Sequence, residues 1–198
     1  MNSWKDAQGW EQKWWNNCSN TFGEEFKQLL YADRMGLIQT PDAKTPYRFD
    51  MQEKSVLDVG GGPVSILLKC INVRGKVIDS LEFPQWVIER YKSAGTEFER
   101  IKAESMSETG WDEAWIYNAL QHVENSEKVI MNTREAAKII RIFEWIGTSV
   151  NIGHPQILTE EKLNSSLRGE GKVEMFTGQN GCKGKGYYGV FKGKRYGQ

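Results

Sequence analysis

The most constraining feature of this chain is the run from Val56 to Pro63, which reads VLDVGGGP. Its first four residues are mostly apolar and predict a buried strand. The three glycines that follow let the backbone turn sharply and approach a ligand, because no Cβ stands in the way. Pro63 is placed to begin a helix over Ser65 to Cys70, whose first N–H groups would point toward that ligand. Together these features predict the first unit of a nucleotide-binding α/β sheet.

The glycine turn differs from the dinucleotide-binding fingerprint G-x-G-x-x-G, because the sixth position counted from Gly60 is Ser65. It resembles instead the first motif of the class I S-adenosylmethionine-dependent methyltransferases, roughly acid-x-Gly-x-Gly-x-Gly. The residues that carry this resemblance are Asp58, Gly60, Gly61 and Gly62. Val64 stands where the third glycine of the motif is often found. The resemblance implies S-adenosylmethionine as the cofactor, and the alternative is a glycine turn used only for packing.

Length and composition favour one globular domain. The chain has 198 residues, of which 39% are hydrophobic and 26% charged, and its formal net charge is zero. We expect a single domain over residues 1–198, with a helical cap and connection over 1–50 and an α/β core over 55–198. The three cysteines form no C-x-x-C pair and the two histidines cannot make a three-histidine site, so no metal is expected. Without an apolar leader or spanning run, a reducing cytoplasmic location is the simplest expectation.

The order of elements predicts a mostly parallel sheet with a C-terminal antiparallel hairpin, a Rossmann-like α/β fold. Residues 1–40 read as two helices, the second of which ends at Gly36. Strands are predicted at Val56–Val59, Lys76–Leu81, Phe98–Lys102, Ala114–Asn118 and Lys138–Trp145, and the hairpin at Val173–Phe176 and Tyr187–Phe191. Helices are predicted over Glu82–Ala94 and Ser126–Thr133, and a short one is capped by Thr159.

Two acids follow the second predicted strand. In the resembled family the second strand ends on an acid that binds the ribose hydroxyls, and Asp79 occupies that place, 17 positions after Gly62. A carboxylate suits a diol because it accepts two strong hydrogen bonds. Glu82 is the rival for this role. Either acid could instead stabilise the start of the following helix.

The segment after the third strand, Ala103 to Met106, looks like the adenine-binding stretch of the family. There an acid binds the exocyclic amine and an apolar neighbour covers the ring. Glu104 and Met106 are the matching positions, with Ser105 between them in the expected binding segment. The alternative is an exposed acid beside a core methionine.

The fourth strand leads into Tyr117 to Val123, which reads YNALQHV. This is similar to an Asn-x-Leu-x-His-Val run that borders the methyl donor in many small-molecule methyltransferases, and it implies that Asn118 contacts the cofactor. The Asn/Asp-Pro-Pro-aromatic signature of enzymes that methylate amino groups of nucleic acids is absent from the sequence. We therefore expect a small-molecule or sugar-type methyl acceptor, which the sequence does not identify.

The N-terminal helices are expected to cover the mouth of the site. Glu24, Gln28 and Tyr31 fall at i, i+4 and i+7, and this polar stripe could bind the methionine part of the cofactor or the acceptor. A solvated helix face is the alternative. Trp10, Trp14 and Trp15 could pack the cap onto the sheet or form a wall of the acceptor pocket.

His122 is the best candidate for a general base, because an imidazole titrates near neutrality and this one follows the fourth strand. His154 and Glu144 are weaker candidates, and a simple pocket wall is the alternative for His122.

Three other functions stay open. The segment from Gly181 to Gln198 carries five cations (Lys183, Lys185, Lys192, Lys194, Arg195) interleaved with Tyr187, Tyr188 and Tyr196, and such a patch could bind nucleic acid. A solvated terminal hairpin is the other explanation. The remaining alternatives are a non-catalytic protein that binds S-adenosylmethionine and a nicotinamide or other nucleotide binder. The oligomeric state is not predicted.

Overall fold

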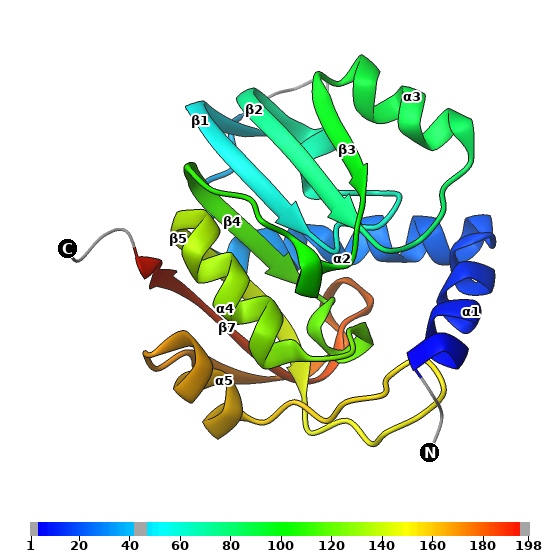
Figure 1. Cartoon of the computed structure of the whole chain (residues 1–198), viewed down its shortest axis with the longest axis vertical. Helices are drawn as coiled ribbons and strands as arrows, with labels where there is room; N and C mark the ends of the chain where they lie inside the picture. The colour runs from blue at the N-terminus through cyan, green and yellow to red at the C-terminus, as the bar shows by residue number, and fades with distance from the viewer. Residues whose placement is uncertain (1–3, 42–46, 195–198) are drawn as a thin grey trace.

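A seven-stranded sheet organises the chain in the computed structural model, which describes residues 4–41 and 47–194 (Figure 1). The strand order is β3-β2-β1-β4-β5-β7-β6. The strands are β1 (Phe49–Val59), β2 (Cys70–Asp79), β3 (Thr96–Arg100), β4 (Trp111–Tyr117), β5 (Ala137–Ile146), β6 (Lys172–Thr177) and β7 (Lys183–Lys192). Strands β1 to β5 pair in parallel, while β7 runs antiparallel to both β5 and β6. The predicted parallel sheet with a C-terminal antiparallel hairpin is therefore confirmed.

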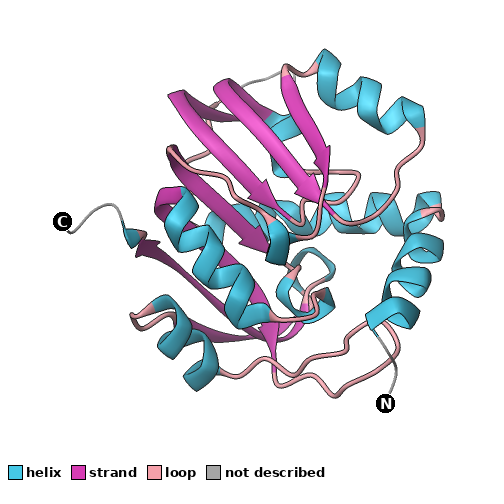
Figure 2. Cartoon of the chain, in the orientation of Figure 1, coloured by secondary structure: helices cyan, strands magenta, loops and turns pink. Residues whose placement is uncertain are grey.

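The described residues form five α-helices, of which α1 crosses the carboxyl ends of the strands while the others flank the sheet (Figure 2). They are α1 (Trp4–Trp15), α2 (Cys18–Arg34), α3 (Gln85–Ser93), α4 (Ser126–Ala136) and α5 (Glu160–Leu167). Local capping explains several boundaries: the side chain of Asn125 accepts from the Lys128 N–H at the start of α4, and Thr159 does the same for Lys162 at the start of α5. Gly36, with φ of +74°, follows the end of α2, as predicted.

The connection between β1 and β2 contradicts the prediction of a helix over 65–70. Only a 3₁₀ turn, Ile66–Lys69, separates the glycines from β2, which begins at Cys70 rather than Lys76. The N–H groups of Ser65 and Ile66 donate to the hydroxyls of Tyr91 (3.1 Å) and Tyr117 (2.9 Å). Two tyrosine hydroxyls thus accept hydrogen bonds from the N–H groups that were expected to face a ligand, so these groups are satisfied without an α-helix.

Helix α2 lies against the sheet face on which that crossover runs, and it contributes to the hydrophobic core (Figure 1). Tyr31 and Met35 are fully buried, and the Tyr31 ring stacks on Phe143 with centroids 4.5 Å apart. A second core, on the opposite face, packs α4 and α5 against the sheet. On α2, Leu30 is buried as well, whereas Phe26 is exposed. The second N-terminal helix is consequently part of the core as well as part of a cap.

Candidate functional site

A cavity of about 300 Å³ lies at the carboxyl ends of β1, β2 and β4, beneath α1. Its volume falls at the lower end of the range typical of small-molecule sites, roughly 300–1,000 Å³. In an open parallel sheet, ligands bind at the carboxyl ends of the strands, at the point where the strand order reverses. Here the order reverses between β1 and β4, which lie side by side. The predicted cofactor-binding and catalytic residues that line the cavity are Gly60, Gly62, Asp79, Glu104, Asn118 and His122, and the weaker candidates Glu24 and His154 line it as well.

The glycine turn forms the floor of this cavity. Gly60 and Gly62 have φ values of +77° and +63°, which side-chain-bearing residues rarely adopt. A Cβ on Gly60 would lie 2.7 Å from the Cβ of Ala119, so the turn and the loop after β4 touch directly. Above Gly62 the nearest atoms belong to the ring of Trp15, 3.5 Å from the place a Cβ would take. The turn is a cradle that only glycine fits without strain.

Asp58 lies inside the protein and does not line the cavity. One of its oxygens accepts from the Tyr117 hydroxyl (2.5 Å) and from Ser65, while the other has no hydrogen-bond partner within the described part of the chain. Burial raises the pKa of Asp58 to about 7, against the lowering effect of those hydrogen bonds. Gly61 packs over this carboxylate, since a Cβ there would come within 2.6 Å of it. Both residues are placed to hold the shape of the turn.

Asp79 and Glu82, the two candidates for the ribose-binding acid, differ in their position relative to the cavity. Asp79 lines the cavity, and its two carboxylate oxygens accept from the N–H groups of Gly62 (3.0 Å) and Leu81 (2.8 Å). Burial raises the pKa of Asp79 to about 6. Glu82 lies outside the cavity lining and pairs with Arg100 at 3.0 Å. Of the two acids, only Asp79 is placed to meet a ligand.

The adenine-binding segment is only partly in the cavity. Glu104 lines it, and one of its oxygens accepts from the N–H groups of Glu124 (2.7 Å) and Asn125 (3.0 Å). Ser105 is exposed and Met106 is buried in the core, and neither lines the cavity. The apolar lining in this region comes instead from Ile78, Leu81, Ile101, Ala103 and Val123.

The polar stripe of α2 divides between cavity and core. Glu24 lines the cavity and accepts from the Asn118 amide at 3.4 Å. Gln28 is buried outside the lining, where its amide donates to the Val64 carbonyl and so ties α2 to the glycine turn. Tyr31 is buried in the core and also lies outside the lining. Asn118 itself has φ of +51° and accepts from the Gln121 amide at 3.0 Å.

His122 is held by an acid on the cap. Its Nδ1 lies 2.9 Å from a Glu11 carboxylate oxygen and 2.8 Å from the Gly153 carbonyl oxygen. Both partners only accept hydrogen bonds, so Nδ1 carries the proton and, in the neutral ring, Nε2 is the basic nitrogen. Burial disfavours the charged ring, but the hydrogen bond to Glu11 and its negative charge outweigh burial and raise the pKa of His122.

The two weaker base candidates have other environments. His154 lines the cavity with its ring centroid 4.7 Å from that of His122. Burial and the neighbouring charge of His122 lower the pKa of His154 to about 4, so it is neutral at physiological pH. Glu144 is buried outside the lining, and one oxygen accepts from the N–H groups of Ala119 and Leu120, both at 3.0 Å. It therefore positions the loop that carries His122, and burial raises its pKa to about 7.

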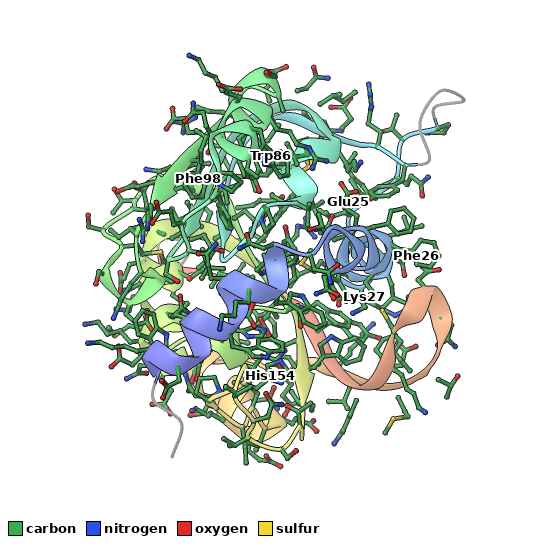
Figure 3. The ribbon with its side chains drawn as sticks, turned by 90° about the vertical axis from the view of Figure 1, so that its right-hand side faces the viewer. Glu25, Phe26, Lys27, Trp86, Phe98 and His154 are labelled. Atoms are coloured by element: carbon green, nitrogen blue, oxygen red, sulfur yellow. The ribbon has the colours of Figure 1, made fainter. Side chains whose placement is uncertain are left out.

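Helix α1 closes the cavity from the side turned to the viewer in Figure 3, where it crosses above His154. It contributes four tryptophans to the lining, Trp4, Trp10, Trp14 and Trp15, and none of them is fully buried in the core. Trp10 and Trp14 stack with ring centroids 5.1 Å apart. Besides the Glu11–His122 contact, Gln8 accepts from the Ser80 hydroxyl at 2.6 Å and so fixes α1 to the end of β2.

Several lining residues were not predicted from the sequence, notably Gln8, Glu11, Lys27, Gln121 and Trp145. Gln8 and Glu11 fall at i and i+3 on α1, so a search for a polar stripe on that helix could have found them. Gln121 carries a buried amide oxygen without a hydrogen-bond partner among the described residues. Such an acceptor in a cavity lining suits a ligand with N–H or O–H groups.

Within the described ranges, no three histidine, cysteine, aspartate or glutamate side chains are grouped so that they could hold a metal ion. No helix in this part of the chain is long and apolar enough to cross a membrane.

Comparisons with known proteins establish the fold. No protein-family model matches the chain, and no curated protein matches its sequence. A SAM-dependent methyltransferase from Aquifex aeolicus superposes with a TM-score of 0.52 at 18% identity, over 71% of this chain and 83% of that one. Burkholderia thailandensis 1,6-didemethyltoxoflavin-N1-methyltransferase, solved with 1,6-didemethyltoxoflavin and S-adenosylhomocysteine, gives 0.52 at 16% identity over 71% of each chain.

A structure with greater coverage comes from the complex between the Haloferax volcanii Trm112 methyltransferase activator and a putative methyltransferase. It superposes with a TM-score of 0.60 at 9% identity, over 92% of this chain and 96% of that chain. The chain therefore has the Rossmann-like fold of class I methyltransferases.

Proposed function

We propose that this protein is an S-adenosylmethionine-dependent methyltransferase that acts on a small-molecule or sugar-type acceptor. The observation that carries the proposal is the convergence of the glycine turn, Asp79, Glu104 and Asn118 on one cavity at the carboxyl edge of the sheet. These residues come from the ends of four successive strands, in the order that the resemblance implies. Solved proteins of the same fold bind S-adenosylhomocysteine, the demethylated cofactor.

The donor set of the cavity fits this cofactor. Asp79 would accept from the ribose hydroxyls, and Glu104 would meet the adenine amine beside the apolar side chains of Ile101 and Ala103. The unpartnered amide oxygen of Gln121 and the Asn118 side chain would face the methionine end. At Gly60 and Gly62 the backbone itself borders the cavity, so a ligand could approach it closely. The adenosine end would thus lie over β2 and β3, and the methionine end over β1 and β4.

The acceptor would then occupy the half of the cavity over β4 and β5. The lining there would come from Trp145 on β5, from His122 and His154 on the loops after β4 and β5, and from Trp10 and Trp14 on α1. When bound, the cofactor supplies an electrophilic sulfonium methyl group. The protein would hold the acceptor in line with that methyl, which can lower a barrier by roughly 7–11 kcal/mol in well-oriented systems.

For a hydroxyl acceptor, His122 would take the proton on Nε2. Its Nδ1–H stays bonded to Glu11 and Gly153, which fixes the ring orientation and stabilises the imidazolium that forms. Glu11 belongs to α1, so in this scheme the base is oriented only when the cap is in place.

The test is ligand binding followed by turnover. We expect S-adenosylmethionine and S-adenosylhomocysteine each to raise the melting temperature, because a ligand at a hundred times its dissociation constant adds about 2.7 kcal/mol of stability. An untargeted assay would then follow radiolabelled methyl groups into a metabolite extract. A melting temperature unchanged by both ligands but raised by NAD would refute the proposal. Binding without transfer to any metabolite or polymer would favour the non-catalytic alternative.

The nucleic-acid alternative loses part of its basis in the structure. Lys183 and Lys185 lie at the start of β7, whereas Lys192 and Lys194 lie at or beyond its end, so these cations do not form one patch. Tyr187 is fully buried, and its hydroxyl donates to Asn164 at 2.8 Å. Arg195 and Tyr196 lie outside the described residues. Salt-dependent binding of RNA or DNA would restore this alternative.

A further inference from the structure

A second hollow, of about 510 Å³, lies at the opposite edge of the sheet from the cofactor cavity. It is formed where α4 and α5 end and where the chain leaves β7, on the far side of the molecule from α1 in Figure 1. Gly193 marks the position: its N–H donates to the carbonyl of Lys138, at the amino end of β5. Nothing in the proposed methyl transfer uses this edge of the sheet.

Cations dominate the lining of this hollow. Arg134, Arg168, Lys192 and Lys194 line it, against one acid, Glu170. Lys194 pairs with Glu135, which lies outside the lining. Within the described residues, Arg134, Arg168 and Lys192 have no carboxylate in ion-pair distance. Three cations without an ion-pair partner therefore converge on a hollow whose lining holds a single acid.

Arg134 is the unusual member, because its side chain is only 8% exposed. A buried guanidinium without an acid partner is costly. Its single hydrogen bond within the described chain goes from Nη1 to the carbonyl of Leu167, at the end of α5. Burial, and then the positive charge of Arg168, lower the pKa of Arg134, as expected for two cations held close together.

Helix capping explains only part of this arrangement. The bond to Leu167 gives Arg134 a structural role at the negative end of α5. It does not account for Arg168 and Lys192, which are exposed and whose side chains make no hydrogen bond or ion pair with any described residue. Both line the hollow together with Arg134.

We propose that this hollow binds the phosphate group of a phosphorylated ligand, with Arg134 at its base and Arg168 and Lys192 at its rim. A guanidinium presents a planar fork of donors that matches two phosphate oxygens, and three cations suit a group that carries more than one negative charge. The hollow is larger than a single phosphate, which leaves space for the remainder of the ligand. The site is independent of the proposed cofactor, which carries no phosphate.

The test is calorimetric titration with inorganic pyrophosphate at constant ionic strength, with the cofactor cavity saturated by S-adenosylhomocysteine. We expect binding to the full chain and a loss of about tenfold or more in affinity for Arg168→Gln/Lys192→Gln, because two charge-assisted contacts disappear. Neither side chain makes a hydrogen bond or ion pair with a described residue, so the variant should fold normally. The matched control is Lys92→Gln, which removes an exposed positive charge at the end of α3.

Three results would overturn the proposal: no binding of millimolar pyrophosphate, equal affinity in the double variant, or an equal loss in the Lys92→Gln control. A second arm identifies the source of the phosphate. A single-stranded RNA oligonucleotide that displaces pyrophosphate, and is weakened by the same double variant, would assign the site to a polynucleotide backbone. Pyrophosphate binding that the RNA leaves unchanged would assign it to a small phosphate ester.

Discussion

The contact between Glu11 and His122 should stabilise the folded protein in a pH-dependent way. The two groups lie 2.9 Å apart, and both are largely removed from solvent. A hydrogen bond to a charged group contributes about 1.5–3 kcal/mol, against about 0.5–1.5 kcal/mol for a neutral one. We expect a double-mutant cycle over Glu11→Gln and His122→Asn to give a coupling energy in the first range at pH 6.

The sign of the pH dependence follows from the raised pKa of His122, which Glu11 maintains against burial. A group that binds its proton more tightly when folded stabilises the protein most below its unfolded pKa, about 6.5 for histidine. That stabilisation is lost as the pH rises through the raised pKa of the folded state. At pH 9 the coupling energy should therefore fall to the neutral range, about 0.5–1.5 kcal/mol.

The assay is urea unfolding of the four proteins at pH 6 and pH 9, without ligand, so the outcome does not depend on the proposed activity. The cycle cancels the titration of neighbouring acids, because each variant retains Asp79 and Glu144. A coupling energy that is equal at the two pH values would mean that His122 is not charged beside Glu11. A value near zero at both would mean that α1 does not hold this contact in solution.

Three further predictions concern the cavity. Asp79→Asn should weaken S-adenosylhomocysteine binding by about 1–3 kcal/mol in calorimetry, since it removes a charged acceptor, while Glu82→Gln should have little effect; the reverse ranking would assign the ribose contact to Glu82. Gly60→Ala should lower the free energy of unfolding by about 1–2 kcal/mol or more, because its Cβ would sit at φ +77° and would also meet Ala119 at 2.7 Å. The control Gly95→Ala, at φ +70° with open space around it, measures the backbone cost alone. Equal losses of stability in the two variants would exclude a steric contribution at Gly60. His122→Asn should reduce turnover of a hydroxyl acceptor by about 10²–10⁴-fold with cofactor affinity retained, and a joint loss of affinity and turnover would instead indicate a pocket wall.

Local sequence signals predicted most of the fold, because the elements concerned depend on neighbouring residues. The alternation of strands and helices, the glycine turn after β1 and the cap residue Thr159 are all of this kind. The start of β1 was missed for a local reason as well. Gln52 and Glu53 have φ values of +54° and +62°, and this bulge interrupts the strand in a stretch too polar to read as one.

The parts of the site that escaped prediction depend on contacts between distant segments. Glu11 and His122 meet only because α1 folds across the carboxyl edge of the sheet, and no spacing in the sequence relates the two. Met106 is apolar and lies two residues after Glu104, yet the chain turns it into the core after a 3₁₀ turn. Which of these two side chains lines the cavity depends on that turn, and the sequence holds no signal that decides it.

Helix α2 lies against the sheet face along which the short crossover between β1 and β2 runs, and its double role there restricts how this protein can change over evolutionary time. Many protein families vary their specificity through surface loops while the hydrophobic core stays the same. Here α2 belongs to both, because Tyr31 fills the interior beside Phe143 while Glu24, two turns earlier, borders the cavity. A change of α2 that alters the cavity wall therefore also alters a helix that packs in the hydrophobic core. Changes at the proposed acceptor end should accumulate more readily on α1 and on residues 148–157 around His154, because these side chains lie outside both hydrophobic cores.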